Sequence, residues 1–186
     1  MKTEFLNTYK LLQRYEPLYP EEGVFKKQMM ELLTICDDCF LRSCRVGHFT
    51  SSAFLLNKDM THVCLMHHTK LDIWIHLGGH CDGNSDVLNV SIKEAQEESG
   101  IKNIRPIDHG IFDIDIHLIP PYSNDEAHYH FDIRFLLHAY EDDRLIKNHE
   151  SKELRWFDKN EEHVPKDVQR MFEKWRKKNF NGQMVY

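Results

Sequence analysis

The segment LGGHCDGNSDVLNVSIKEAQEESGI, residues 77–101, constrains the fold more than any other part of the chain. It opens with closely spaced glycines and continues with Asn84, Ser85 and Asp86, which are residue types that favour the start of a helix. Gly100 is the residue type that most readily ends a helix in a left-handed conformation. The spacing predicts a helix over residues 86–99 that follows a glycine-rich turn.

Three glutamates lie on one face of this predicted helix. Glu94, Glu97 and Glu98 are three and four residues apart, so their side chains rise from the helix about one turn from each other. Like charges at this spacing repel each other by a few tenths of a kcal/mol at an exposed site. Either the face is solvated and Lys93 offsets the repulsion, or the carboxylates bind a hard divalent cation such as Mg²⁺.

The sequence on both sides of this segment has β character. HFTSSAFLLN and HVCLMHH flank NKDM, a polar stretch typical of a hairpin turn. DIWIHL and ELRWF are short strands, and polar and apolar residues alternate in IRPIDHGIFDIDIHLI and AHYHFDIRFLLHAY. VPKDVQRMFEKWRKK is expected to be a helix. The pattern predicts a mixed β-sheet with helices packed on it, in the α/β (α+β) class.

Residues 1–45 are expected to form a helical extension, and residues 46–186 the main domain. A short helix is predicted over residues 3–14. A longer one is predicted over residues 21–40, where apolar residues recur at helical spacing: Phe25, Met29, Leu32, Leu33, Cys36 and Phe40. This stripe must be buried either on the protein's own sheet or across a homodimer. Cys36 and Cys39 are interpreted as buried thiols, because a closed zinc site needs four ligands.

Composition excludes several classes of protein. The chain has 186 residues, of which 41% are hydrophobic, and this suits one domain with a sizeable core. It carries 24 Lys and Arg against 30 Asp and Glu, so no broad basic face is available for bulk nucleic acid. No stretch approaches the roughly 18 apolar residues of a membrane span. Five cysteines, without an export signal, indicate reduced thiols and a cytoplasmic protein.

The segment that contains the three glutamates resembles the signature of the Nudix (MutT-like) hydrolases. That signature is a glycine, five residues, a glutamate, seven residues, and then Arg-Glu-apolar-x-Glu-Glu-x-Gly-apolar. Here the glycine is Gly79 and the final block is KEAQEESGI, with the spacing intact. Two positions depart from the pattern, because Ser85 stands in place of the first glutamate and Lys93 in place of the arginine. The resemblance implies a Nudix-type α/β/α sandwich.

The resemblance also implies a reaction and a metal ion. Nudix hydrolases cleave a phosphoric anhydride in a nucleoside diphosphate linked to another group, with Mg²⁺ or Mn²⁺. By resemblance, Glu97 and Glu98 are the principal metal ligands, Glu94 is a ligand or base, and Gly79 lets the backbone approach the ions. Ser85 and Lys93 cannot form the bidentate bond that an arginine and a carboxylate form. Asp82 and Asp86 are the nearby carboxylates available to replace the missing glutamate.

Several residues outside the signature are further candidates. Nudix proteins sometimes take a general base from a later loop, where NHESKELRWF offers Glu150 and Glu153, and we expect Glu153 to be catalytic. Contacts to the small-molecule nucleotide substrate are expected from four residues: Lys93, His80, His130 and Arg134. Two other functions stay open within the superfamily. One is a non-catalytic nucleotide-sensing module, and the other is an isoprenoid diphosphate isomerase, for which Cys81 would be the catalytic thiol.

Overall fold

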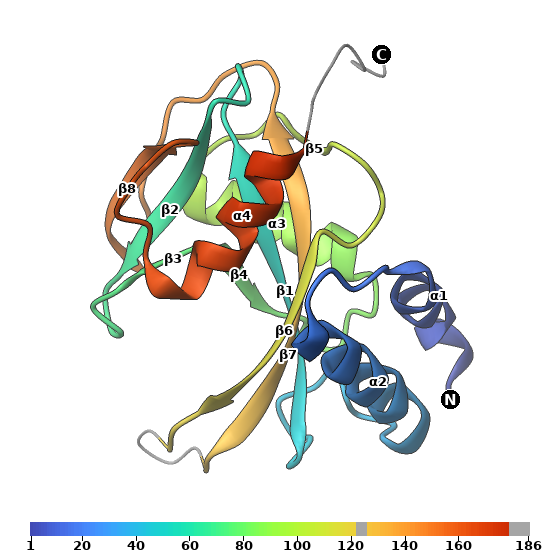
Figure 1. Cartoon of the computed structure of the whole chain (residues 1–186). Coiled ribbons are helices and arrows are strands. Elements are labelled where there is room, and N and C mark those ends of the chain that lie inside the picture. The colour runs from blue at the N-terminus through green and yellow to red at the C-terminus, as the bar shows by residue number, and fades with distance from the viewer. Residues whose placement is uncertain (122–125, 179–186) are drawn as a thin grey trace.

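We describe a computed structural model of the protein, which covers residues 1–121 and 126–178 (Figure 1). The helices are η1 (Thr3–Phe5), α1 (Leu6–Arg14), α2 (Pro20–Ile35), α3 (Val87–Ser99), η2 (Lys166–Val168) and α4 (Gln169–Lys177). The strands are β1 (Gly47–Leu56), β2 (His62–His68), β3 (Trp74–Ile75), β4 (Leu77–His80), β5 (Ile104–Pro106), β6 (Asp113–Ile119), β7 (His128–Ala139) and β8 (Ser151–Asp158). Within these ranges, each helix is too short or too polar to cross a membrane.

The strands form one mixed sheet, as the sequence predicts. β1 and β7 lie side by side in parallel at its centre, with His48 opposite His130 and Ser52 opposite Arg134. The other pairings are antiparallel: β1 with β2 and β4, β7 with β5 and β6, and β2 with β3 and β8. The predicted hairpin is confirmed, since Leu56 pairs with Val63 across the NKDM turn.

Helices cover both faces of this sheet. In Figure 1, α4 crosses in front of the sheet and α3 lies behind it. In the larger core, α3 behind the sheet and α1 and α2 at its side pack against residues such as Phe49 and Ile133. In front, Phe172 and Trp175 of α4 pack against Phe54. Every residue of β1 is therefore buried, as expected of a strand that is covered on both faces. The predicted α/β/α sandwich is confirmed.

Some predicted elements end elsewhere than expected. The helix predicted over residues 21–40 stops at Ile35, because Cys36 is extended and the chain then turns through Asp37 and Asp38. The strand predicted in DIWIHL is divided into β3 and β4. The long strand predicted in IRPIDHGIFDIDIHLI is divided into β5 and β6 by a turn, in which the side chain of Asp108 accepts a hydrogen bond from the backbone N–H of Gly110.

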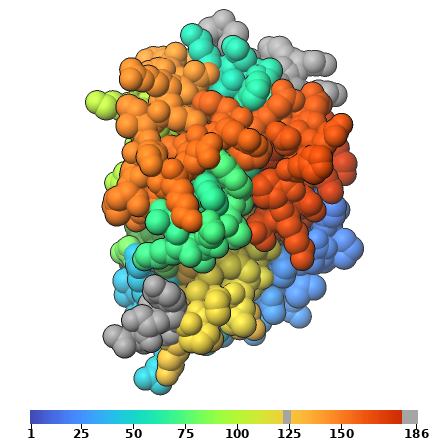
Figure 2. Space-filling view, turned by 90° about the vertical axis from the view of Figure 1, so that its left-hand side faces the viewer, coloured from blue at the N-terminus to red at the C-terminus, as the bar shows by residue number. Residues whose placement is uncertain are grey.

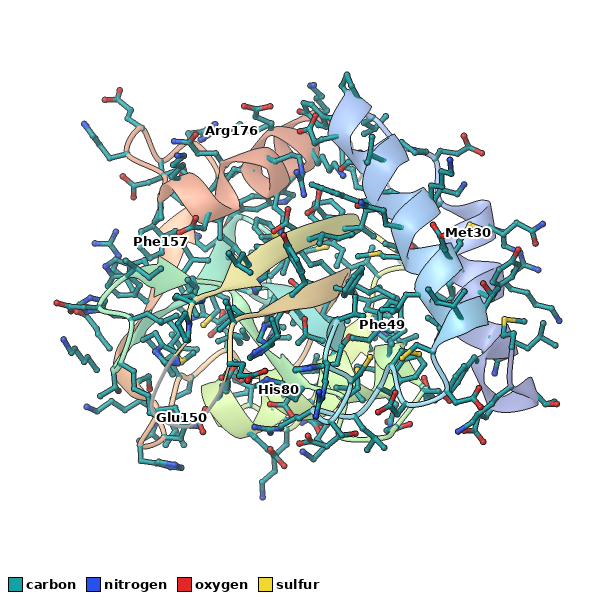
Figure 3. The ribbon with its side chains drawn as sticks, turned by 90° about the horizontal axis from the view of Figure 1, so that it is seen from below. Met30, Phe49, His80, Glu150, Phe157 and Arg176 are labelled. Carbon is teal, nitrogen blue, oxygen red and sulfur yellow. The ribbon has the colours of Figure 1, made fainter. Side chains whose placement is uncertain are left out.

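The N-terminal helices pack on the protein's own sheet. Met29, Leu32 and Leu33 of α2 are buried in the same core as α3. The apolar stripe is therefore covered by the protein's own fold rather than by a second copy of the chain. Figure 3 shows α2, marked by Met30, beside the sheet with α4 at its upper end. There the buried ammonium of Lys174 pairs with the carboxylates of Glu22 and Asp113. The division at residue 45 stays a prediction.

Candidate active site

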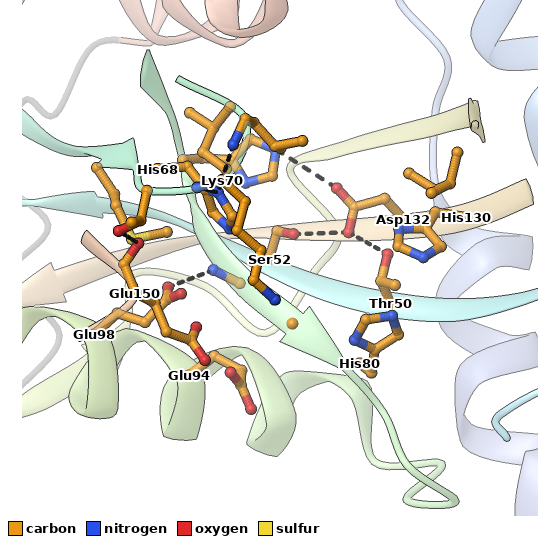
Figure 4. A pocket seen from close by; sticks show the side chains of 18 of the residues that line it. Thr50, Ser52, His68, Lys70, His80, Glu94, Glu98, His130, Asp132 and Glu150 are labelled. Atoms are coloured by element: carbon orange, nitrogen blue, oxygen red, sulfur yellow. Dashed lines mark hydrogen bonds and ion pairs between the residues drawn. The ribbon is translucent and has the colours of Figure 1, made fainter. Parts of the chain in front are cut away.

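A cavity of about 510 Å³ opens where β4 and the end of α3 meet the front face of the sheet. Its walls come from β1, β2, β4, β6, β7, α3 and the loop before β8. Figure 4 shows Glu94, Glu98 and Glu150 on one side of it and His80 and His130 on the other. Figure 2 shows the outer surface next to the cavity. On this surface, the β2–β3 segment (green) lies between β8 with its loop (orange) and β6 (yellow).

Glu98 is held at the wall of the cavity by the glycine turn. Its side chain accepts a hydrogen bond of 2.8 Å from the backbone N–H of Gly78, and the residue is only 3% exposed. Burial raises the pKa of Glu98 to about 8, although the hydrogen bond from Gly78 acts in the opposite direction. Burial also raises the pKa of Glu94, which lines the same cavity. The two carboxylates therefore lie where a compensating cation is favourable.

The third glutamate of the signature lies apart from this pair. Glu97 is outside the cavity lining, and its side chain is 56% exposed. Lys93 bridges the helix face, with its ammonium 3.3 Å from a carboxylate oxygen of Glu94 and 3.2 Å from one of Glu97. Successive residues turn by about 100° around a helix, so Glu97 and Glu98 point in different directions. Lys93 itself is also outside the cavity lining.

Ser85 forms hydrogen bonds with the N-terminal extension. Its hydroxyl donates a hydrogen bond to the carbonyl of Glu4, and its own carbonyl accepts one from the hydroxyl of Thr8. Neither nearby aspartate substitutes for the missing glutamate. Asp82 is paired with Arg42, and Asp86 caps α3 by accepting a hydrogen bond from the N–H of Asn89.

The loop before β8 brings Glu150 to the cavity. The backbone carbonyl of Glu150 accepts hydrogen bonds from the N–H and the hydroxyl of Thr69, which ties this loop to the end of β2. Glu153, which we had expected to be catalytic, lies within β8 opposite His67 and outside the cavity lining. Strand β8 begins at Ser151, two residues before the predicted strand. Glu153 therefore lies in the strand, and Glu150 is the glutamate that lies in the loop.

Gly79 lies against the carboxylate of Glu94. A Cβ at this position would come within 2.5 Å of the Glu94 Oε2 atom, so any larger residue would displace the Glu94 carboxylate. Glu94, Glu98 and Glu150 line the cavity together with Gly79. This is a donor set of the type that Mg²⁺ and Mn²⁺ prefer, so the residues present fit such an ion.

The floor of the cavity is a buried polar network around Asp132. This carboxylate accepts hydrogen bonds from the hydroxyls of Thr50 and Ser52 and from the guanidinium of Arg134. Burial alone would raise the pKa of Asp132, but the charge of Arg134 holds it well below its usual range. Arg134 also pairs with Asp113 and lies outside the cavity lining, although we had expected it to contact the substrate. Its partners identify it as a structural residue of this network.

Histidines form the opposite end of the cavity. His80 and His130, both predicted to contact the substrate, are in its lining, with their ring centroids 4.9 Å apart. Burial, and then the charge of His80, lowers the pKa of His130 to about 3. Burial likewise lowers the pKa of His76 to about 4. The rings of His130 and His76 are therefore neutral near pH 7.

Two hydroxyl residues of the cavity are not among the predicted site residues. Thr50 and Ser52 both contact Asp132 from the front face of β1. The segment HFTSSAFLL predicts a strand, and hydroxyl residues at alternate positions of an apolar strand indicate a polar patch on one face. Their partner lies 80 or more residues away, so the sequence gives no direct sign of the contact.

The chain matches the family model described as NUDIX domain over residues 48–177, and it therefore belongs to this family. It is a Nudix hydrolase, an enzyme that acts on phosphoric anhydrides. No curated protein matches the chain.

Solved structures show the same fold. A UDP-X diphosphatase is 12% identical, with a TM-score of 0.52 over 92% of this chain and 91% of that chain. The MutT protein from Methanosarcina mazei Go1 is 17% identical, with a TM-score of 0.51 over 69% of this chain and 91% of that chain. At these identities the likeness concerns the fold alone.

Proposed function

We propose that this protein hydrolyses the pyrophosphate bond of a nucleoside diphosphate linked to another group, with Mg²⁺ or Mn²⁺ as its cofactor. The observation that carries the proposal is the meeting of Glu94, Glu98 and Glu150 at one wall of a cavity large enough for part of a nucleotide. Two of these carboxylates come from α3 and one from the loop before β8. A pyrophosphate carries several negative charges, so three carboxylates beside it require cations between them.

Glu94, Glu98 and the backbone of Gly79 would hold the cation in this proposal. When bound, the ion neutralises the phosphate oxygens and activates water for attack. Glu97 stays a candidate ligand by its place in the signature, and its pairing with Lys93 is exposed and therefore weak.

The protein's own groups hold the carboxylates in position. The N–H of Gly78 fixes one oxygen of Glu98, and the absence of a side chain at Gly79 leaves space for the Glu94 carboxylate. Glu150 lies on a loop fixed by Thr69 and is the candidate general base, a role for which the residue must be within reach of the attacking water. His80 and His130 at the other end of the cavity are candidate contacts for the remainder of the substrate.

The test is a panel of nucleotide sugars, dinucleotides, oxidised nucleoside triphosphates and capped RNA ends, each with Mg²⁺ and with Mn²⁺. The products are identified by phosphorus-31 NMR, which shows which anhydride bond is cleaved. We expect cleavage of at least one compound, and we expect it to depend on the added metal. Failure to cleave any compound with either metal would contradict the proposal.

The isomerase alternative is disfavoured by the position of Cys81. This residue is buried and lies outside the cavity lining, and burial raises the pKa of its thiol far above the physiological range. A catalytic thiol needs the opposite conditions, namely access to the substrate and a lowered pKa. The sensing module is disfavoured because the carboxylates at the cavity are retained.

A further inference from the structure

The strand register gathers histidines at one end of the front face of the sheet. His48 of β1 is opposite His130 of β7, and His128 lies two residues earlier on the same face of β7. His117 of β6 is opposite His130 on its other side. The rings of His48, His128 and His130 have centroids 5.0–5.2 Å apart, and His80 of β4 lies 5.1 Å from His48.

His48 is buried with neither ring nitrogen satisfied. The residue is 2% exposed, and both its Nδ1 and Nε2 atoms lack a hydrogen-bond partner among the described residues. The buried Nε2 atom of His130 also lacks one within the same ranges. A buried polar group without a partner is destabilising, so such groups in a folded protein call for a missing ion or water.

His128 is oriented as a metal ligand is. The carbonyl of Glu126 lies 2.8 Å from its Nδ1 atom, and a carbonyl can only accept, so Nδ1 carries the proton. Nε2 is then left with a free electron pair. A backbone carbonyl that fixes the tautomer in this way is the usual outer partner of a metal-binding histidine.

We propose that His48, His128 and His130 form a binding site for a divalent transition-metal cation of the Zn²⁺ class. One potential ligand nitrogen from each ring lies within 4.8 Å of the others. In a tetrahedral site with Zn–N bonds of about 2.0–2.1 Å, ligand nitrogens are about 3.4 Å apart, which the rings reach by rotating about their side-chain bonds. Imidazole nitrogen favours Zn²⁺, Cu²⁺ and Ni²⁺, whereas Mg²⁺ and Mn²⁺ favour oxygen.

Three histidines leave a fourth coordination position for another ligand. His80 is close to both His48 and His130, and it lines the cavity together with His130. The histidine site therefore borders the cavity at the end opposite Glu94 and Glu98, as the labelled residues in Figure 4 show. It shares no ligand with the carboxylate site, so the two sites can be tested separately.

The experiment measures Zn²⁺ binding to the full chain, after removal of metal by a chelator. Isothermal titration calorimetry gives affinity and stoichiometry, and the visible absorption of bound Co²⁺ reports nitrogen coordination. We expect one Zn²⁺ per chain and a melting temperature that rises with Zn²⁺. His128→Ala and His48→Asn are each expected to weaken Zn²⁺ binding at least tenfold. Replacement of the half-buried His128 leaves the core intact, so this variant tests the site even if His48→Asn unfolds.

Two control variants separate this site from other histidines and from the carboxylates. His109→Ala removes an exposed histidine outside the cluster and should leave Zn²⁺ binding unchanged. Glu98→Gln should keep Zn²⁺ binding while losing Mg²⁺-dependent turnover, so failure of the proposed hydrolysis and failure of this site are distinguishable. A wild-type protein that binds no stoichiometric Zn²⁺ would overturn the proposal. So would a His128→Ala variant with wild-type affinity, because the ion would then be held elsewhere.

Discussion

The backbone N–H of Gly78 donates a hydrogen bond of 2.8 Å to the buried carboxylate of Glu98, twenty residues later in the chain. This bond joins the glycine turn to the last turn of α3, so the two halves of the Nudix signature are in direct contact. Because the bond needs only an oxygen on residue 98, a glutamine there can keep it while losing the charge. The contribution of the charge can therefore be measured without disturbing the fold.

We expect Glu98→Gln to lower turnover about a hundredfold or more. That loss corresponds to about 2.7 kcal/mol or more of transition-state stabilisation. The free energy of unfolding should change little or rise, since a buried carboxylate is replaced by a neutral group of the same size. Turnover is measured against Mg²⁺ concentration on one substrate, beside urea denaturation. Gln96→Ala is the control on the same helix, because Gln96 hydrogen-bonds the carbonyl of Lys102 outside the cavity. Wild-type turnover in Glu98→Gln would remove Glu98 from the mechanism.

A second pair of variants tests whether Glu150 or Glu153 is the general base. Glu150 lines the cavity and Glu153 lies in β8 outside it, so Glu150→Gln should lower kcat at least tenfold. Glu153→Gln should have a clearly smaller effect. The measurement is kcat for both variants on one substrate. A larger loss in Glu153→Gln would reverse this assignment.

The ends of α3 could be predicted because their signals are local. Asp86 accepts a hydrogen bond from the N–H of Asn89, and Gly100 has a φ of 74°, both as the sequence indicates. Helix geometry separates the side chains of the adjacent Glu97 and Glu98 by about 100°, but it does not indicate which of the two faces the cavity. Only Glu98 is opposite the N–H of Gly78. That contact depends on how β4 meets the helix.

The contact of Ser85 could not be predicted either, because its partner is far away in the sequence. The sequence identifies Ser85 as a departure from the Nudix signature but gives no reason for it. In the fold its hydroxyl donates to the carbonyl of Glu4, a residue 81 positions earlier. Local patterns predicted the hairpin, the mixed sheet and the helical extension, whereas this contact requires knowledge of where the extension packs.

We expect the buried ion cluster around Asp113 to make the fold sensitive to acid. Burial would raise the pKa of Asp113, but hydrogen bonds from Arg170 and the charges of Arg134 and Lys174 hold it well below its usual value. A lowered pKa in the folded state adds stability above the unfolded pKa of about 3.9, and this contribution is lost as the pH falls below it. Asp113→Asn should cost about 3–5 kcal/mol at pH 7, because it leaves buried cations short of a partner.

Urea denaturation between pH 3 and pH 7 tests this expectation. The free energy of unfolding of the wild type should fall with acid, and that of Asp113→Asn should fall less steeply. Asp142→Asn is the control, since Asp142 is exposed and its side chain accepts a hydrogen bond from the backbone N–H of Arg144. Parallel curves for the wild type and Asp113→Asn would show that Asp113 does not titrate as the ion pairs predict.

The last prediction concerns the N-terminal extension, whose removal should leave the rest of the chain insoluble. Deletion of residues 1–45 would expose the apolar face on which Met29 and Leu33 pack, and it would remove Glu22 from the buried Lys174. A milder change tests the same contact. Leu33→Ala, at a site 1% exposed, should cost about 2–5 kcal/mol, whereas Leu18→Ala, at a site 68% exposed, should cost little. Solubility and thermal melting are the measurements. A truncated protein that stayed monomeric, with the melting temperature of the full chain, would show that the extension is dispensable for folding.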